Sequence, residues 1–212
     1  MYRVVTLLVL CVVGSGSSAS ADGLYFTESV GGTQIKDELG EYIDGGLRLR
    51  LSLGWRHRRW AVEGWVAGDI AAQGSHVDDP AGRPYDTAYR PAPTLMTYGL
   101  DLKHIRPISD HVEVYLRGSV SRGRTQGVLD GYSGRGLGFG AGVQLEGKVR
   151  ALGFLAWPLF FTGWGPKVTA AVFVDNGYDF YRLHREGKLS ATPAVDAQLT
   201  HLTIGFGVGS DF

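Results

Sequence analysis

The residues of this chain best suited to acid–base chemistry are its histidines. The sequence contains six of them: His57, His76, His104, His111, His184 and His201. Acyl transfer or ester hydrolysis needs a histidine close to a nucleophile and an orienting acid. His201 precedes Thr203 by two residues, so both lie on one face of a strand, but the hydroxyl of a serine is the usual nucleophile. We therefore predict no catalytic residues and no enzyme activity.

Metal and nucleotide sites are not expected either. No histidine pair has the spacing of metal ligands with carboxylates in support. Asp78 and Asp79 are adjacent in a segment with Pro and Gly, a pattern typical of a solvated loop. The glycines between residues 134 and 142 alternate with larger residues, as in a strand, and do not form a phosphate-binding loop. We expect no cofactor and no bound metal.

The N-terminal residues have the layout of a secretory signal peptide. Arg3 precedes an apolar run over residues 4–13, and Ala19, Ser20 and Ala21 form a small-residue cleavage site. The run is too short for a membrane-spanning helix, which needs roughly 20 apolar residues. We predict a signal peptide over residues 1–21 and one domain over residues 22–212. The only cysteine, Cys11, falls inside the signal peptide, which excludes a disulfide from the secreted domain.

Composition narrows the class further. Lys plus Arg and Asp plus Glu are 21 each, so nothing indicates a nucleic-acid partner. The chain has 32 glycines, and they are dispersed through alternating segments. Because each glycine inside a helix costs about 1 kcal/mol relative to alanine, this frequency argues against a helical protein.

The strongest pattern has a period of two residues, the spacing of side chains on the two faces of a strand. From Leu47 to Trp55 every odd position is apolar, while Arg48 and Arg50 fall between. Similar patterns predict eight strands, over residues 24–35, 47–55, 60–70, 95–104, 112–120, 137–149, 167–175 and 201–212. In the first of them either face can be the apolar one, because Glu28 lies opposite Tyr25, Thr27 and Ile35.

Connections between these strands alternate in length. Residues 57–59 and 107–110 form tight turns. Residues 36–40 are the exception, a short connection on the side of the long loops. Residues 72–93, 122–134 and 176–196 form longer polar or glycine-rich connections. Short turns on one side and long loops on the other are typical of outer-membrane barrels.

Charged residues of both signs share the faces opposite the apolar ones. In a membrane barrel these side chains point into the lumen and pair there, while the apolar faces meet lipid. The predicted lumen charges are Arg48, Arg50, Glu63, Asp69, Asp101, Lys103, Glu113, Arg117, Glu146, Lys148 and Asp175. Periodicity alone leaves open a soluble, lipocalin-like ligand-binding barrel with the opposite orientation.

Aromatic residues cluster where strands end. Trp55 and Trp60 flank the first tight turn, and Tyr178, Phe180 and Tyr181 follow the seventh strand, as expected of interfacial belts. An apolar segment over residues 151–166 lies where a short periplasmic turn is expected. It can continue the sixth strand along the rim, form an interfacial helix, or cap the periplasmic mouth, and its interfacial aromatics are Trp157, Phe160, Phe161 and Trp164.

The signal peptide, the eight strands and the terminal Phe212 resemble the OmpA/OmpX-like outer-membrane β-barrels over essentially the whole secreted chain. This resemblance implies an all-β, eight-stranded antiparallel up-and-down transmembrane barrel in the outer membrane of a Gram-negative bacterium. It also implies that the barrel-assembly machinery reads the last strand, in which Gly207 and Phe212 match the expected signal. Ser210 stands where an apolar residue is usual.

The sequence says less about function than about fold, because proteins with the same fold have many different functions. Eight strands enclose a lumen that side chains fill, so we expect no open pore. The sequence favours a structural, anchoring or surface-interaction barrel whose partners are outer-membrane lipids and a surface ligand or envelope protein. The alternatives are a lipid-modifying enzyme of the lipid A deacylase or acyltransferase type, and the soluble carrier.

Overall fold

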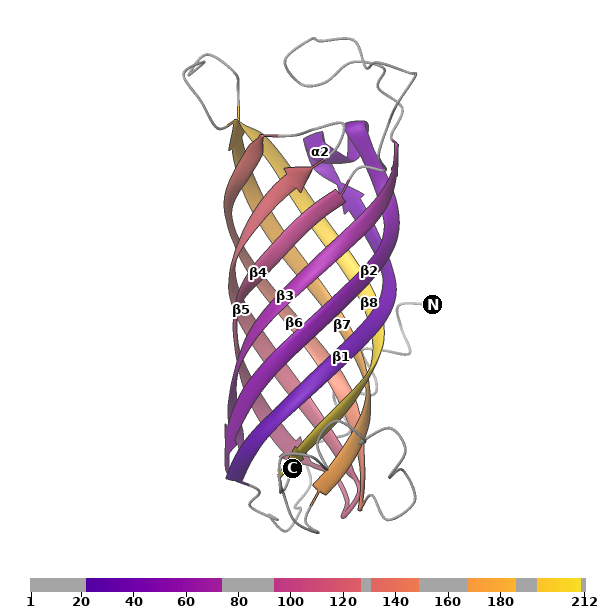
Figure 1. Ribbon diagram of the computed structural model, residues 1–212, viewed down its shortest axis with the longest axis vertical. Helices are drawn as coiled ribbons and strands as arrows, with labels where there is room; N and C mark the ends of the chain where they lie inside the picture. Colours follow the sequence, from indigo (N-terminus) through magenta and orange to yellow (C-terminus); the bar gives the residue numbers. More distant parts are fainter. Residues whose placement is uncertain (1–21, 74–93, 127–130, 149–167, 186–193, 211–212) are drawn as a thin grey trace, which may run out of the picture.

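A closed barrel of eight antiparallel strands forms the protein (Figure 1). The computed structural model describes residues 22–73, 94–126, 131–148, 168–185 and 194–210. Each strand pairs with the next in sequence, and the last pairs with the first, so no edge stays open. The strands are β1 (Asp22–Lys36), β2 (Ile43–His57), β3 (Trp60–Gln73), β4 (Thr94–Pro107), β5 (Val112–Gln126), β6 (Tyr132–Lys148), β7 (Val168–Arg185) and β8 (Val195–Ser210). The predicted fold class is confirmed.

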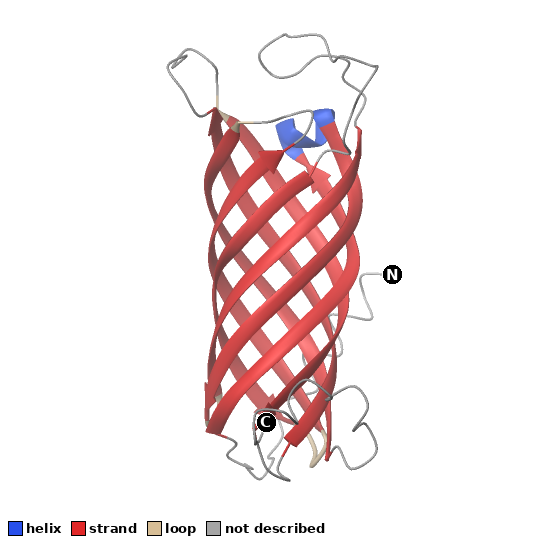
Figure 2. Cartoon of the chain, viewed as in Figure 1, coloured by secondary structure: helices blue, strands red, loops and turns tan. Residues whose placement is uncertain are grey.

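A short helix, α2 (Asp37–Tyr42), connects β1 and β2 at the end drawn at the top of Figure 2. The tight turns after β2 and β4 lie at the opposite end of the barrel, at Arg58–Arg59 and at residues 108–111. Among the described residues there is no helix with the length and apolar character needed to cross a membrane.

Apolar side chains point outward and charged ones inward along the middle of the wall. In β2, Leu49 is 48% exposed while its neighbour Arg48 is fully buried. In β3, Val62 is 47% exposed and Glu63 only 1%. A soluble barrel has the reverse arrangement, because it buries its apolar face. The lipocalin-like alternative is therefore excluded.

Strand β1 follows the same rule with one exception. Tyr25, Thr27 and Ile35 point into the barrel and are buried. Glu28 consequently points outward and is exposed, between Leu51 of β2 and Phe206 of β8 in the register. The ambiguity of this strand is resolved against grouping Glu28 with the lumen charges.

The strands are longer than the sequence predicted. A tilted strand crosses the apolar core of a membrane in roughly 9–11 residues, but β7 has 18 residues. The predicted long loop over residues 176–196 is wrong, since β7 continues to Arg185 and β8 begins at Val195. The connection predicted over residues 122–134 is shorter for the same reason, because β5 ends at Gln126 and β6 begins at Tyr132.

The pattern of the two faces reverses in these extensions. Near α2 the lumen is filled by an apolar cluster, and the outward positions of β7 and β8 carry Arg182, His184 and Asp196. The cluster contains Ile35, Leu39, Ile43, Leu95, Tyr132, Tyr181, Leu183, Val195, Ala197 and Leu199. Beyond the lipid the outside of a barrel meets water, so its apolar side chains gain by turning inward, as in a soluble protein. This reversal marks where the apolar belt ends.

Candidate functional site

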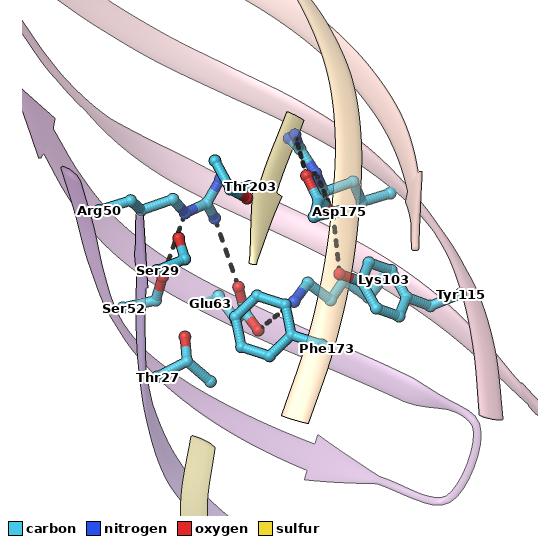
Figure 3. Close-up of a pocket in the computed structure, with 11 residues that line it drawn as sticks. Thr27, Ser29, Arg50, Ser52, Glu63, Lys103, Tyr115, Phe173, Asp175 and Thr203 are labelled. Carbon is cyan, nitrogen blue, oxygen red and sulfur yellow. Dashed lines mark hydrogen bonds and ion pairs between the residues drawn. The ribbon is translucent and has the colours of Figure 1, made fainter. Parts of the chain in front are cut away.

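The middle of the lumen holds a network of ion pairs contributed by facing strands (Figure 3). The Arg50 guanidinium lies 2.7 Å from Asp101 Oδ2 and 3.4 Å from Glu63 Oε2. Lys103 Nζ forms a second ion pair with Glu63, and Trp65 Nε1 donates to Asp101 at 2.6 Å. All these side chains are buried. Each charge thus has an opposite charge or a polar donor in place of water.

Arg117 joins the two sides of the network. Its Nη2 lies 2.9 Å from Asp175 Oδ1 and 2.7 Å from Nε2 of His201, and its Nη1 lies 3.5 Å from Asp101 Oδ2. Tyr115 donates its hydroxyl proton to Asp175 at 2.9 Å. A guanidinium presents several donors in one plane, which suits it to bridge carboxylates from different strands.

Toward α2 the network continues through Arg48. Arg48 Nη1 lies 2.7 Å from Asp69 Oδ2, and its Nη2 lies 3.7 Å from Asp179 Oδ2. Thr33 donates to Asp69 at 2.7 Å. His201 Nδ1 lies 3.6 Å from Asp179, which connects this layer to Arg117.

At the end with the tight turns, Arg56 forms a bidentate pair with Glu113. Its Nη1 and Nη2 lie 2.8 and 2.7 Å from the two carboxylate oxygens. Nη1 also reaches Glu146 at 3.3 Å, and Gln144 donates to Glu146 at 2.7 Å. Tyr25, Ala61, Ile105 and Tyr115 form a small apolar cluster in the lumen.

Two small cavities lie within the described part of this network. One cavity of about 10 Å³ is lined by Arg50, Glu63, Lys103, Arg117 and Phe173, among others. A second of about 10 Å³ is bordered by Tyr25 and Arg56. A cavity must offer roughly 10–15 Å³ to hold one water molecule. In the described part of the lumen these cavities have room for about a single water, not for a substrate.

The structure brings the predicted lumen charges together, apart from Lys148, whose side chain it does not describe. Ten of the eleven predicted residues point inward, and the side chain of Lys148 lies outside the described residues. Sequence reasoning missed Arg56 and Asp179, which belong to the same network. Arg56 continues the alternation of Arg48 and Arg50, and Asp179 that of Asp175, but both lay beyond the predicted strand ends.

Two predicted interfacial aromatics point outward at the end with the tight turns. Trp55 is 54% exposed and stacks on His57, and Trp60 is 52% exposed and contacts His104 at 4.7 Å between ring centroids. Phe180 also points outward, but Tyr181 belongs to the inner apolar cluster. The predicted aromatics Trp157, Phe160, Phe161 and Trp164 lie outside the described residues, as does Phe212. Gly207 lies in β8 and is buried.

The structure places two of the histidines on opposite sides of the barrel wall. His201 and Thr203 are buried inside the lumen, where His201 contacts Arg117. His184 points outward near the end of β7, and His76 lies outside the described residues. Among the described residues, no three His, Cys, Asp or Glu side chains could hold a metal ion.

The sequence matches no described family. It also matches no curated protein. Its fold, however, is similar to solved structures. Neisserial surface protein A superposes with a TM-score of 0.54 at 18% identity, covering 87% of this chain and 96% of that one.

Two further structures align less closely. The attachment invasion locus protein Ail of Yersinia pestis, solved with the heparin analogue sucrose octasulfate, gives a TM-score of 0.46 at 14% identity over 89% of this chain and 99% of Ail. The outer membrane protein OprG of Pseudomonas aeruginosa gives 0.43 at 12% identity over 92% and 97%. In fold, the chain is an eight-stranded barrel of the outer-membrane type, with apolar residues outside and ion pairs within.

Proposed function

We propose that this protein is an integral barrel of a Gram-negative outer membrane with a structural, anchoring or surface-interaction role and a closed lumen. The observation that carries the proposal is the orientation of Leu49 and Arg50. Adjacent in β2, they are 48% and 9% exposed, the apolar one outward. A belt of exposed apolar side chains without lipid would expose far more apolar surface than soluble proteins tolerate.

The ion-pair network supports a closed lumen. Arg117 reaches from β5 to Asp175 on β7 and contacts His201 on β8, so its side chain crosses the interior. The cavities beside it have volumes near 10 Å³. Opening a path for ions would require breaking several buried ion pairs, each of which leaves an unpaired charge. These contacts favour a barrel that does not conduct ions over a pore.

The role of a lipid-modifying enzyme is disfavoured. Such an enzyme needs its nucleophile and base at the lipid-facing rim, but His201 and Thr203, the one pair that the sequence places on a common strand face, lie inside the lumen. His184 does point outward near the end of β7, without a recognisable catalytic motif around it. The remaining steps of the proposal are secretion, cleavage after Ala21 and insertion by the barrel-assembly machinery. In the membrane, the loops then bind a surface ligand or an envelope protein.

Fractionation of cells expressing the full-length protein tests the location. We expect the protein in the outer-membrane fraction, beginning at Asp22, and a gel mobility that changes on heating because the detergent-extracted barrel unfolds only when boiled. Recovery of a soluble protein from the periplasm would contradict the proposal.

Planar-bilayer recording of the refolded protein tests the closed lumen. We expect no steady conductance from the wild-type barrel. Two variants are recorded beside it. Arg117→Ser removes a side chain that crosses the lumen, and Arg182→Ser, on the outer surface, is its matched control. Steady conductance of the wild type would show that the network gates a pore and does not seal it.

A further inference from the structure

Three arginines face outward in one row across neighbouring strands. Arg122 of β5 pairs with Arg135 of β6, and Arg135 pairs with Arg182 of β7 in the strand register. All three are exposed. Directly opposed residues have Cβ atoms roughly 4.5–5.5 Å apart, and like charges there destabilise a sheet. The row thus concentrates positive charge on one patch of the barrel wall.

The row lies at the edge of the apolar belt. Two residues from each arginine, on the same outward face, lies an exposed apolar side chain: Val120 beside Arg122, Leu137 beside Arg135 and Phe180 beside Arg182. On the other side of the row the exposed residues are polar, among them Arg124 and His184. These strands continue there toward the end that carries α2 (Figure 1). The arginines therefore stand at the level where a lipid's head group meets its chains.

A groove of about 680 Å³ connects the two zones. Its lining includes Val120, Leu137 and Phe180 together with Arg135 and Arg182. Asp37 and Asp196 also line the groove, and Asp196 lies beside Arg182 on β8. Arg122 lies outside the lining, next to Arg135 in the register, so the positive charge is concentrated on the side of β5 and β6. The groove thus combines apolar side chains with two arginines, and its two carboxylates are Asp37 and Asp196.

The arginines have few partners of their own. Arg182 lies 3.7 Å from Asp196, but this pair is solvent-exposed, 72% and 55%, and such pairs contribute little. Within the described part of the chain, Arg122 and Arg135 form no ion pair. A phosphate group matches this arrangement, because guanidinium groups bind phosphate with two parallel hydrogen bonds.

We propose that Arg122, Arg135 and Arg182 bind the phosphate of a phosphorylated outer-leaflet glycolipid, whose acyl chain lies along Val120, Leu137 and Phe180. The inference rests on the proposed orientation, in which the short turns are periplasmic and the α2 end faces outward. It names a lipid partner for the outer wall and leaves the surface ligand of the loops open.

Native mass spectrometry of the refolded protein in an uncharged detergent tests the proposal, with bisphosphorylated lipid A as the probe. We expect retained lipid A on the wild type and at least a tenfold weaker affinity for Arg122→Gln/Arg135→Gln/Arg182→Gln. The corresponding triple Lys variant keeps the charge and should retain most of the binding. Lipid A without phosphates should bind poorly to every variant.

The matched control is Arg58→Gln/Arg59→Gln/Arg106→Gln, which removes the same charge at the opposite end and should bind like the wild type. Unchanged affinity of the first variant, or equal binding of dephosphorylated lipid A, would overturn the proposal. Full competition by inorganic phosphate would show an anion site without a lipid partner, which also overturns it. The heat-dependent gel shift of each variant separates these outcomes from a failure to form the barrel, and if the triple variant does not fold, Arg135→Gln alone replaces it.

Discussion

Arg117 on β5 and Asp175 on β7 form an ion pair of 2.9 Å although β6 lies between their strands in the barrel wall. The pair is possible because β6 contributes glycines at this height. Gly140 is the register partner of Arg117, and Gly142 that of Asp175. A Cβ atom on Gly140 would lie 2.9 Å from Arg117 Nε, so any side chain there would obstruct the guanidinium. The glycines of β6 thus leave room for the ion pair that fills the lumen.

Removing one member of this pair should cost much stability. Asp175→Asn leaves Arg117 buried with Asp101 at 3.5 Å as its nearest remaining carboxylate. Removing one partner of a buried ion pair costs about 3–5 kcal/mol where the remaining charge is uncompensated. Because Asp101 stays near Arg117, we expect a loss at the lower end of this range. Equilibrium unfolding in guanidinium from lipid vesicles measures the change.

The matched control for the lumen pair is Asp196→Asn, which removes the partner of exposed Arg182. Exposed pairs contribute about 0–1 kcal/mol, so we expect little change. Losses of equal size at Asp175 and Asp196 would show that the lumen is as wet as the outer surface.

The sequence predicts the two faces of the wall in the middle of the barrel, because apolar side chains point outward there and charged ones point inward. From Leu47 to Trp55 apolar residues alternate with charged or small ones, which indicates lipid on one side of the strand and the lumen on the other. Arg48 and Arg50 could therefore be assigned to the network from their positions in the alternation. Their individual partners could not, since Asp69 and Asp101 lie on other strands and their distances depend on barrel closure.

The same rule fails beyond the membrane. Leu183 and Leu199 point inward there, with Arg182 and Gln198 outward. This is the pattern of a soluble strand, so a rule that requires apolar residues on the outside predicts a loop over these residues. Asp179 still follows the rule of the membrane-spanning part, with Phe180 outward, but it lies beyond residue 175, where the seventh strand is predicted to end. Glu28 was ambiguous because a single charge on the lipid-facing side contradicts the pattern, and only the register with Leu51 and Phe206 resolves it.

The glycines that face the lumen should tolerate no side chain. A Cβ on Gly142 would collide with the Tyr115 ring and lie 2.7 Å from the carbonyl oxygen of Val174. The backbone cannot move aside, so Gly142→Ala should cost about 1–3 kcal/mol, the usual range for overpacking. Gly118→Ala, on the outward face with open space around it, should be neutral or stabilising. Unfolding midpoints of the two variants in the same vesicles compare them, and a neutral Gly142→Ala would show that Tyr115 is loosely held.

Replacing Glu28 should stabilise the barrel. This carboxylate lies among outward apolar residues, where lipid solvates charge poorly. Arg or Lys at the bilayer midplane costs about 2–4 kcal/mol, and an acidic residue costs less. We expect Glu28→Leu to raise the unfolding free energy by about 1 kcal/mol. Gln34→Leu, on the same face beyond the apolar belt, should change it by a smaller amount. A loss of stability in Glu28→Leu would indicate that Glu28 has a partner in the membrane.

Replacing an outward tryptophan and replacing an inward one should change the quenching of fluorescence by lipid in opposite directions. Trp60 is 52% exposed on the outer wall, while Trp65 is 5% exposed in the lumen and donates to Asp101. Brominated acyl chains quench fluorescence only on contact, so Trp60→Phe should lower the quenched fraction of the total emission. Trp65→Phe removes an unquenched fluorophore and should raise that fraction. Because both variants replace one indole by one phenyl ring, the opposite sign isolates orientation from the loss of a fluorophore. The same sign in both would mean that lipid reaches the lumen or does not reach Trp60, and either result contradicts the orientation on which the closed barrel depends.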